Sequence, residues 1–257
     1  MREFRFGIGI LTLASCLTMV GAPAFADSEV NPRELVQRVL EGLPKDSFEA
    51  RMTVSSSDFE PREMRMVRRY AEGTNGTYLE VLSPPDLEGI RFLFLERANK
   101  PNEQYIKVTA SRTAIQVSED VRRQPFLGST FYVSDLVMPD IDAYTFKYLG
   151  KDVIEDRTVT LVEMTPKDPD ADIYGKTISA LDPKDNLVLR REYFDKNGKK
   201  IKVWTVDKIE KIKDVLSPTG QKMVDLRTGK SSRLDVSKVN FDAEVTDAIF
   251  TPRYLIR

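Results

Sequence analysis

The sequence predicts a mainly β, single-domain protein in which an antiparallel barrel or sandwich follows one short helix. Period-two alternation between residues 48 and 241 gives roughly ten strand candidates at the spacing of such folds. Tight-turn sequences separate these strands and favour hairpins between sequence neighbours. They are Asn75-Gly76, residues 182–186, Asn197-Gly198, residues 217–220 and Thr228-Gly229. No long helical pattern interrupts the strands, which argues against a parallel α/β sheet.

The N-terminus has the features of a secretory signal peptide. Arg2 and Arg5 precede a mostly apolar run over residues 7–20, and Ala24-Phe25-Ala26 offers a small-residue cleavage site. We therefore expect residues 1–26 to be a signal peptide and residues 27–257 to be the mature domain. A second interpretation stays open, because residues 13–16 also read as a lipobox in which Cys16 becomes acylated.

Composition excludes several kinds of chemistry. The sequence has no histidine, and its single cysteine, Cys16, lies in the predicted leader. The mature chain then has no disulfide, no thiolate nucleophile and no histidine base or metal ligand. Lys and Arg number 39 against 40 Asp and Glu, so no excess of positive charge predicts nucleic-acid binding. We expect no cofactor and no metal.

A short amphipathic helix is expected at the start of the mature chain. Asn31 is a good N-cap, Pro32 suits the first helical position, and Gly42 with Pro44 ends the pattern. Its apolar face consists of Leu35, Val36, Val39 and Leu40. A helix of this kind packs its apolar stripe on a sheet.

Two strands differ in their alternation. Thr113, Ile115 and Val117 alternate with polar residues, as in a strand with one face in water. Residues 91–96 are apolar on both faces, so each face needs a cover. The twisted sheet supplies one cover. We expect the N-terminal helix and residues 125–136 to supply the other.

Residues 125–136, "PFLGSTFYVSDL", concentrate large apolar side chains around a Gly-Ser break. Loops seldom carry so many apolar groups without a partner to cover. We interpret the segment as a lid made of a loop and a short helical turn, with Gly128 as a hinge.

This arrangement resembles the LolA-like outer-membrane lipoprotein-sorting proteins of Gram-negative bacteria. The resemblance covers nearly all of the mature chain and includes the hairpin at residues 193–200. The family usually carries a Gly-Ser-Asp-Phe-Ser-Tyr-Glu-Asp-Leu type of segment. This sequence keeps Gly128, Ser129, Phe131, Asp135 and Leu136, and it departs at Thr130, Tyr132, Val133 and Ser134.

The resemblance implies an unclosed antiparallel β-barrel, a half-barrel, with a helical lid over an apolar cavity. It implies a periplasmic carrier, not an enzyme, that binds acyl chains of lipoproteins or lipids and moves them between the inner and the outer membrane. The expected partners are these acyl chains, an inner-membrane transporter and an outer-membrane acceptor; we expect a monomer. The candidate lipid-contacting residues are Leu35, Val36, Val39, Leu40, Phe92, Phe94, Phe126, Leu127, Phe131 and Leu136, with Gly128, Ser129 and Asp135 as motif residues.

Other interpretations remain open at this point. Apolar residues at strand spacing are more often plain core than ligand lining. If Cys16 is acylated, the protein is a membrane-anchored accessory to an inner-membrane lipid exporter. Asp135, Asp140 and Asp142 also admit a carboxylate-dependent hydrolase. Trp204 is expected to pack in the sheet, and the basic stretch at residues 184–213 to form a solvated outer face or, alternatively, a docking surface.

Overall fold

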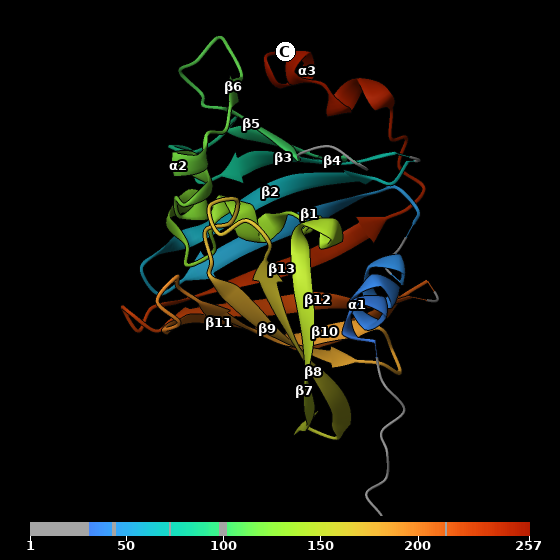
Figure 1. The fold of residues 1–257 in the computed structure, drawn as a ribbon. Helices are drawn as coiled ribbons and strands as arrows, with labels where there is room; N and C mark the ends of the chain where they lie inside the picture. Colours follow the sequence, from blue (N-terminus) through green and yellow to red (C-terminus); the bar gives the residue numbers. More distant parts are fainter. Residues whose placement is uncertain (1–30, 43–44, 72, 98–101, 214) are drawn as a thin grey trace, which may run out of the picture.

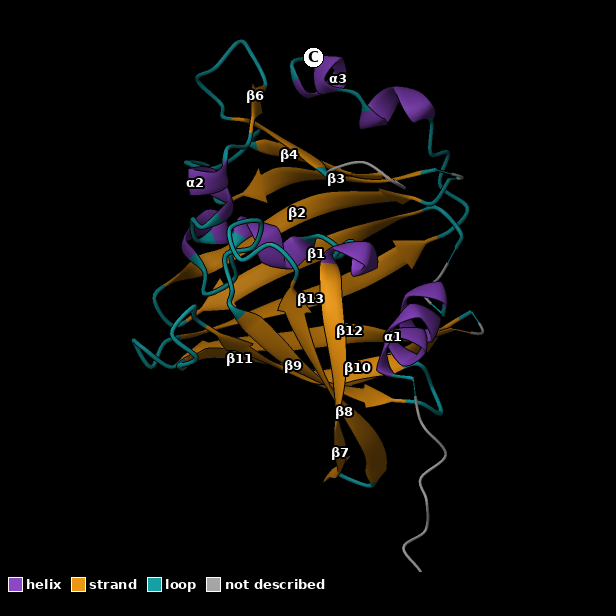
Figure 2. Ribbon diagram, in the orientation of Figure 1, coloured by secondary structure: helices purple, strands orange, loops and turns teal. Residues whose placement is uncertain are grey.

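The computed structural model describes residues 31–257 except 43–44, 72, 98–101 and 214. The predicted signal peptide, Cys16 and Pro44 lie outside the described residues. Within the described part, one 13-stranded antiparallel sheet forms the body of the molecule (Figures 1 and 2). The predicted mainly β, unclosed half-barrel is confirmed.

The first six strands run in chain order from the middle of the sheet to one edge, and the last seven run from the opposite edge back to the middle. The strands are β1 (Phe48–Ser56), β2 (Phe59–Arg69), β3 (Thr74–Ser83), β4 (Arg91–Arg97), β5 (Glu103–Lys107), β6 (Ile115–Gln116), β7 (Tyr144–Ile154), β8 (Arg157–Pro166), β9 (Lys176–Asp182), β10 (Leu187–Phe194), β11 (Lys200–Ile212), β12 (Val215–Asp225) and β13 (Ser231–Asn240). Sequence neighbours pair from β1 to β6 and again from β7 to β13, and β1 pairs with β13. β6 and β7 are the two edges, so the sheet stays open.

The helices are few and short. They are α1 (Pro32–Glu41), α2 (Glu119–Arg122) and α3 (Pro252–Leu255), with 3-10 turns η1 (Phe126–Gly128), η2 (Val133–Leu136), η3 (Ile141–Ala143) and η4 (Asp247–Phe250). In Figure 1, α1 and the connection from β6 to β7 lie on the same side of the sheet, called the inner face below. In the described part of the chain, no helix has the length and apolar character needed to span a bilayer.

The N-terminal helix forms as predicted, but it packs elsewhere. Asn31 Oδ1 accepts hydrogen bonds from the backbone N–H groups of the first turn, and Gly42 ends the helix. Its apolar stripe packs on β8 and β9, through Val162, Met164 and Leu181. The expectation that this helix covers residues 91–96 is wrong, because an amphipathic stripe specifies an apolar partner without specifying which strands provide it.

The strand β4 is covered on both faces by segments far away in sequence. Phe92 and Phe94 contact the segment around residues 126–133 on the inner face. Leu93 and Leu95 share a second cluster with the C-terminal residues Ile249, Phe250 and Leu255 on the other face. No sequence pattern predicts this second cover, because η4 and α3 are too short to show a helical period.

Two of the predicted turns lie inside strands. Asn75-Gly76 belongs to β3, where a Cβ on Gly76 would lie only 2.4 Å from the Phe250 ring. The glycine is therefore needed for close packing. Residues 217–220 belong to β12, beside register shifts in its pairing with β11. Gly198 and Gly229 do form turns at positive φ.

The alternating strand expected around Thr113, Ile115 and Val117 is shorter than predicted. Only Ile115–Gln116 forms the edge strand β6, and both residues are exposed. Val117 is buried and joins the cluster beneath the connection to β7. An edge strand pairs with only one neighbour, so few hydrogen bonds are lost when β6 ends and Val117 turns into the cluster.

Candidate functional site

The residues 117–143, called the lid below, connect the two edges of the sheet. The segment starts after β6 and ends at β7, the opposite edge, and it crosses the inner face, where it packs on the sheet (Figure 1). It contains α2, η1, η2 and η3, none longer than four residues. Helices this short are unstable alone. The lid conformation therefore depends on contacts with the sheet.

The lid contributes four buried apolar side chains to the core, Val117 at its start and three others around its turns. These three are Phe126, Phe131 and Val133, and they share one cluster with residues of β1 to β4 and β10 to β13. The Phe126 ring lies 5.0 Å from the Phe92 ring, centroid to centroid. Burying one such side chain contributes roughly 1.5–3 kcal/mol. In this closed form, lid side chains fill the inner face beneath the lid.

The tip of the lid is a tight turn that holds two residues in the left-handed region. Leu127 has φ 48° and Gly128 has φ 72°. The turn is closed by the Phe126 N–H, which donates to the Phe131 carbonyl at 2.7 Å. The buried Ser129 hydroxyl accepts a hydrogen bond from the Phe131 N–H. A leucine in this conformation costs about 1–2 kcal/mol, so the turn persists because its surroundings hold it.

The Thr130 side chain and backbone attach this tip to the far half of the sheet. The Thr130 N–H donates to Ser232 Oγ on β13 at 3.0 Å, and Thr130 Oγ1 donates to the Met223 carbonyl on β12 at 2.8 Å. Thr130 stands where the family pattern carries Asp. A neutral hydroxyl therefore makes the contact at this position.

A buried ion pair is the second polar attachment of the lid. Asp135 of η2 and Lys202 of β11 are 2% and 0% exposed, with Oδ2 and Nζ 3.4 Å apart. The Tyr174 hydroxyl donates to Asp135 Oδ1 at 2.8 Å, and the Tyr132 N–H donates to Asp135 Oδ2 at 2.7 Å. Lys202 Nζ also lies 3.0 Å from the centroid of the Tyr132 ring. We call this arrangement the Asp135–Lys202 pair.

Burial dominates the electrostatics of this pair. Desolvation lowers the pKa of Lys202 to about 8, although attraction to Asp135 opposes the shift. Burial, followed by the nearby Asp135 carboxylate, raises the pKa of Tyr174 well above its ordinary value. The prediction of a solvated outer face is therefore wrong at Lys202. The available signal was period two, which puts Lys202 on the same face as Trp204.

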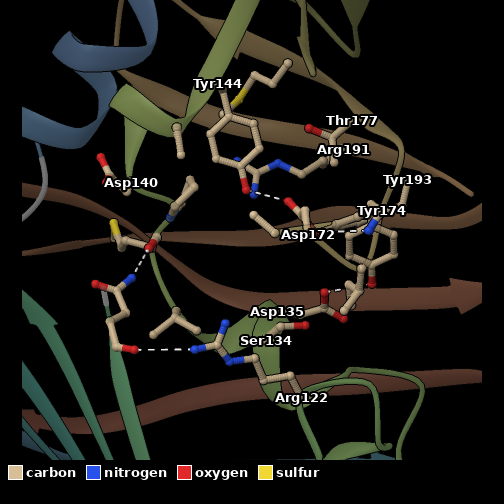
Figure 3. Close-up of a pocket in the computed structure, with 18 of the residues that line it drawn as sticks. Arg122, Ser134, Asp135, Asp140, Tyr144, Asp172, Tyr174, Thr177, Arg191 and Tyr193 are labelled. Carbon is tan, nitrogen blue, oxygen red and sulfur yellow. Dashed lines mark hydrogen bonds between the residues drawn. The ribbon is translucent and has the colours of Figure 1, made fainter. Parts of the chain in front are cut away.

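A cavity of about 770 Å³ opens beside this pair (Figure 3). Ser134 and Asp135 contribute from the lid, and Tyr144 and Arg191 contribute from β7 and β10. The Tyr144 hydroxyl donates to Asp172, and the two side chains point toward each other in the close-up. Burial is the main cause that raises the pKa of Tyr144. The lining therefore mixes carboxylates, guanidinium groups and hydroxyls with apolar atoms.

A second cavity, of about 710 Å³, lies next to the first. The two cavities share Asn102 and the lid residues Met138, Pro139, Asp140 and Asp142. This part of the lid therefore borders both cavities, close to α1, whose Arg33 forms an ion pair with Asp142.

The structure separates the predicted lipid-contacting residues into two groups. Phe92, Phe94, Phe126 and Phe131 are buried in the lid cluster, and Leu127 and Leu136 pack against it. Leu35, Val36 and Val39 lie in the separate cluster on β8 and β9, with Leu40 at its side. Of the predicted set and its motif residues, Asp135 lines the first cavity and Leu40 lines the second. Contact with an acyl chain stays a prediction for all ten.

The three acids of the hydrolase interpretation have structural contacts. Asp135 belongs to the buried pair, Asp140 caps η3 through the Asp142 N–H, and the Asp142 carboxylate contacts Arg33. Their side chains therefore support the lid and α1. Over the residues that the structure describes, no group of three or more acidic, His or Cys side chains is placed to hold a metal ion.

Three solved structures share this architecture. An outer membrane lipoprotein-sorting protein domain from Vibrio parahaemolyticus is 23% identical with a TM-score of 0.82, covering 88% of this chain and 98% of that one. A DUF1329 family protein from Desulfovibrio piger is 20% identical with a TM-score of 0.79, covering 87% and 97%. A LolA superfamily protein from Nitrosomonas europaea is 18% identical with a TM-score of 0.67, covering 88% and 99%.

These likenesses define the class: the chain has the LolA-like fold, and the resemblance inferred from the lid sequence is confirmed. A family model described as an uncharacterized protein matches residues 73–257, and the chain belongs to that family. The comparison with curated proteins gave no match.

Proposed function

We propose that the protein is a periplasmic carrier that binds acyl chains of lipoproteins or lipids between the lid and the inner face. It moves them between the inner and the outer membrane. The observation that carries this proposal is the insertion of Phe126, Phe131 and Val133 from a connecting segment into the apolar cluster of the sheet. The description of the Vibrio protein as a lipoprotein-sorting domain supports the proposal.

Loading is an exchange of one apolar group for another. When the lid lifts, Phe126, Phe131 and Val133 and the surface beneath them become available to an acyl chain. Lifting them exposes apolar surface worth roughly 5–9 kcal/mol, at about 1.5–3 kcal/mol each. Burying a chain of about twelve methylenes returns roughly 10 kcal/mol, at about 0.8 kcal/mol each. The two terms are close, which favours reversible loading and delivery.

The polar attachments suit the same role. The strained turn at Leu127 and Gly128 and the desolvated Lys202 both reduce the stability of the closed form. A lid held by weak, non-directional contacts and a few polar ones can open without unfolding the sheet. The proposed activity needs no catalytic residue.

The proposal includes delivery between proteins. The partners are an inner-membrane transporter that donates the acylated cargo and an outer-membrane acceptor, with the carrier acting as a monomer. If Cys16 is acylated, the same site belongs to a membrane-anchored accessory of an exporter. Mass spectrometry of the mature protein distinguishes these two forms, because a chain that begins at an acylated Cys16 differs in mass from one that begins at Asp27.

The direct test is uptake of an acyl probe by delipidated protein. We expect a fluorescent fatty-acyl probe to bind with a stoichiometry of one protein to one or two chains, and unlabelled lipopeptide to displace it. Native mass spectrometry checks the stoichiometry. If the probe does not bind under conditions in which an established LolA carrier loads, the lid cluster is ordinary core and the proposal is wrong.

A further inference from the structure

The cavity of about 770 Å³ lies at the side of the lid and continues the proposed acyl site. Ser134 and Asp135 line it, and they directly follow Val133, which is buried in the apolar cluster beneath the lid. An acyl chain that replaces the lid side chains would therefore have its polar end near this cavity. The chemistry of the lining indicates what that end carries.

Two buried polar atoms in the lining have no hydrogen-bond partner among the described residues. Gln104 is 3% exposed, and its Oε1 makes no hydrogen bond. Ser134 Oγ is likewise buried without a partner. Leaving such a group unsatisfied costs about 1–3 kcal/mol, so buried polar atoms without protein partners point to a bound molecule. Gln104 Oε1 is an acceptor and requires an N–H or O–H donor.

The charged groups of the cavity add donors and acceptors side by side. Asp172 accepts from the Tyr144 hydroxyl and the Tyr174 N–H, and no ion pair with it occurs in the described part of the chain. Arg191 reaches the cavity from β10, where its Nε donates to Ser179 Oγ at 2.9 Å. A hydrocarbon chain would remove water from these charged groups and offer them no new hydrogen bond, which is costly. The occupant is therefore polar and offers both donors and acceptors.

A short peptide fits this pattern. Each peptide bond supplies one N–H donor and one C=O acceptor. The donor matches the acceptor oxygens of Gln104 and Asp172, and the acceptor matches the guanidinium group of Arg191. The volume falls within the range of sites for ligands of several hundred daltons, larger than a single lipid headgroup requires. Building on the proposed carrier function, we propose that this cavity binds the peptide segment that follows the acylated residue of a lipoprotein cargo.

Three probes test this proposal on the mature protein: a dipalmitoylated cysteinyl tetrapeptide, palmitate, and phosphatidylethanolamine with the same acyl chains. The variants are Gln104→Leu and Asp172→Asn, which remove an acceptor from two different segments. The matched controls are Gln116→Leu on the exposed edge strand β6 and Asp156→Asn in the exposed turn after β7.

We expect each cavity variant to weaken lipopeptide binding about tenfold, as loss of one such hydrogen bond predicts, and to change palmitate binding less than twofold. The controls should match wild type with all probes. Circular dichroism melting checks that each variant is folded. Equal weakening of lipopeptide and palmitate, or unchanged lipopeptide binding in both variants, would overturn the proposal.

The probes also separate the possible failures. Wild type that binds palmitate and lipopeptide equally well remains a carrier, and the cavity proposal alone is wrong. Phosphatidylethanolamine that binds more tightly than lipopeptide, and loses affinity in both variants, assigns the cavity to a headgroup and overturns the peptide assignment. Wild type that binds none of the three probes contradicts the carrier function itself.

Discussion

Lys202 Nζ lies 3.4 Å from Asp135 Oδ2, and this buried contact joins the lid to strand β11. Neither side chain is more than 2% exposed, so each charge depends on the other for compensation. Lys202→Met should therefore lower the free energy of unfolding by about 3–5 kcal/mol, because it leaves an unpaired carboxylate. The double variant Asp135→Leu/Lys202→Met should recover much of that loss. Urea unfolding of the wild type, Lys202→Met, Asp135→Leu and the double variant measures both effects.

The matched control for this cycle is Lys208→Met on the same strand. Lys208 is more than half exposed and pairs with Glu210, so its loss should change stability by less than about 1 kcal/mol. If the two single substitutions at Asp135 and Lys202 add without coupling, the ion pair does not hold the lid.

Stability should depend on alkaline pH through Lys202. Burial lowers its pKa to about 8, from an ordinary value of 10.5, so between these values the folded protein binds fewer protons than the unfolded chain. The free energy of unfolding therefore rises with pH. Of its charged neighbours, Asp135 and Asp225 raise the pKa and Arg227 lowers it.

The expected rise is about 1 kcal/mol between pH 8 and 9, measured by urea unfolding at each pH. Above about pH 9 the tyrosines whose pKa is raised by burial, such as Tyr144, Tyr174 and Tyr193, begin to oppose it, because they lose their protons more readily in the unfolded chain. Lys202→Met should remove the rise between pH 8 and 9. A wild-type profile that falls over this interval would mean that Lys202 is accessible to water.

The turn at Gly128 should be sensitive to a single methyl group. Gly128 has φ 72°, and a Cβ there would lie 3.1 Å from Arg62 Nη1. Gly128→Ala should cost about 1–2 kcal/mol and should accelerate hydrogen exchange at the lid amides of Phe126 and Thr130. Gly198→Ala, at φ 80° with open space around it, has a similar backbone cost but should leave exchange in the lid unchanged. Equal lid exchange in the two variants would refute a local effect.

The outer cover of β4 should contribute to stability and not to loading. Phe250 packs on Leu93 and Leu95 across the sheet from the lid cluster. Phe250→Ala should lower the free energy of unfolding by about 3–5 kcal/mol and leave acyl-probe affinity of the folded fraction unchanged. Thermal melting checks the loss of stability, and titration with the acyl probe checks the unchanged affinity. A large loss of affinity would show that the outer face takes part in binding.

The sequence predicted what depends on local pattern. Alternation gave the strands, Asn31 and Gly42 bounded α1, and the apolar side chains at Phe126 and Phe131 indicated a segment covered by the sheet. Local pattern could not find the Asp135–Lys202 pair, because its partners are 67 residues apart. Local pattern also predicted a turn at Asn75-Gly76, which lies inside β3. From sequence alone, a glycine that makes room for an aromatic ring, here Phe250, cannot be distinguished from a glycine in a turn.

The edge-to-edge path of the lid was also beyond local pattern. It follows from the strand order, in which the chain leaves the sheet at β6 and re-enters it at β7. Only the complete pairing shows that the connection joins opposite edges of the sheet. The polar cavity could not be predicted for the same reason, because its lining comes from the lid, β5 and β7 to β10 together.

The most direct test of the carrier function is a disulfide that locks the lid. The Thr130 N–H donates to Ser232 Oγ at 3.0 Å, which places positions 130 and 232 side by side, and a chain starting at Asp27 contains no other cysteine. In Thr130→Cys/Ser232→Cys, with the bond confirmed by mass, we predict that the oxidised protein does not load a fluorescent fatty-acyl probe. Reduction should restore wild-type loading. Equal loading by the oxidised and the reduced protein would contradict the account.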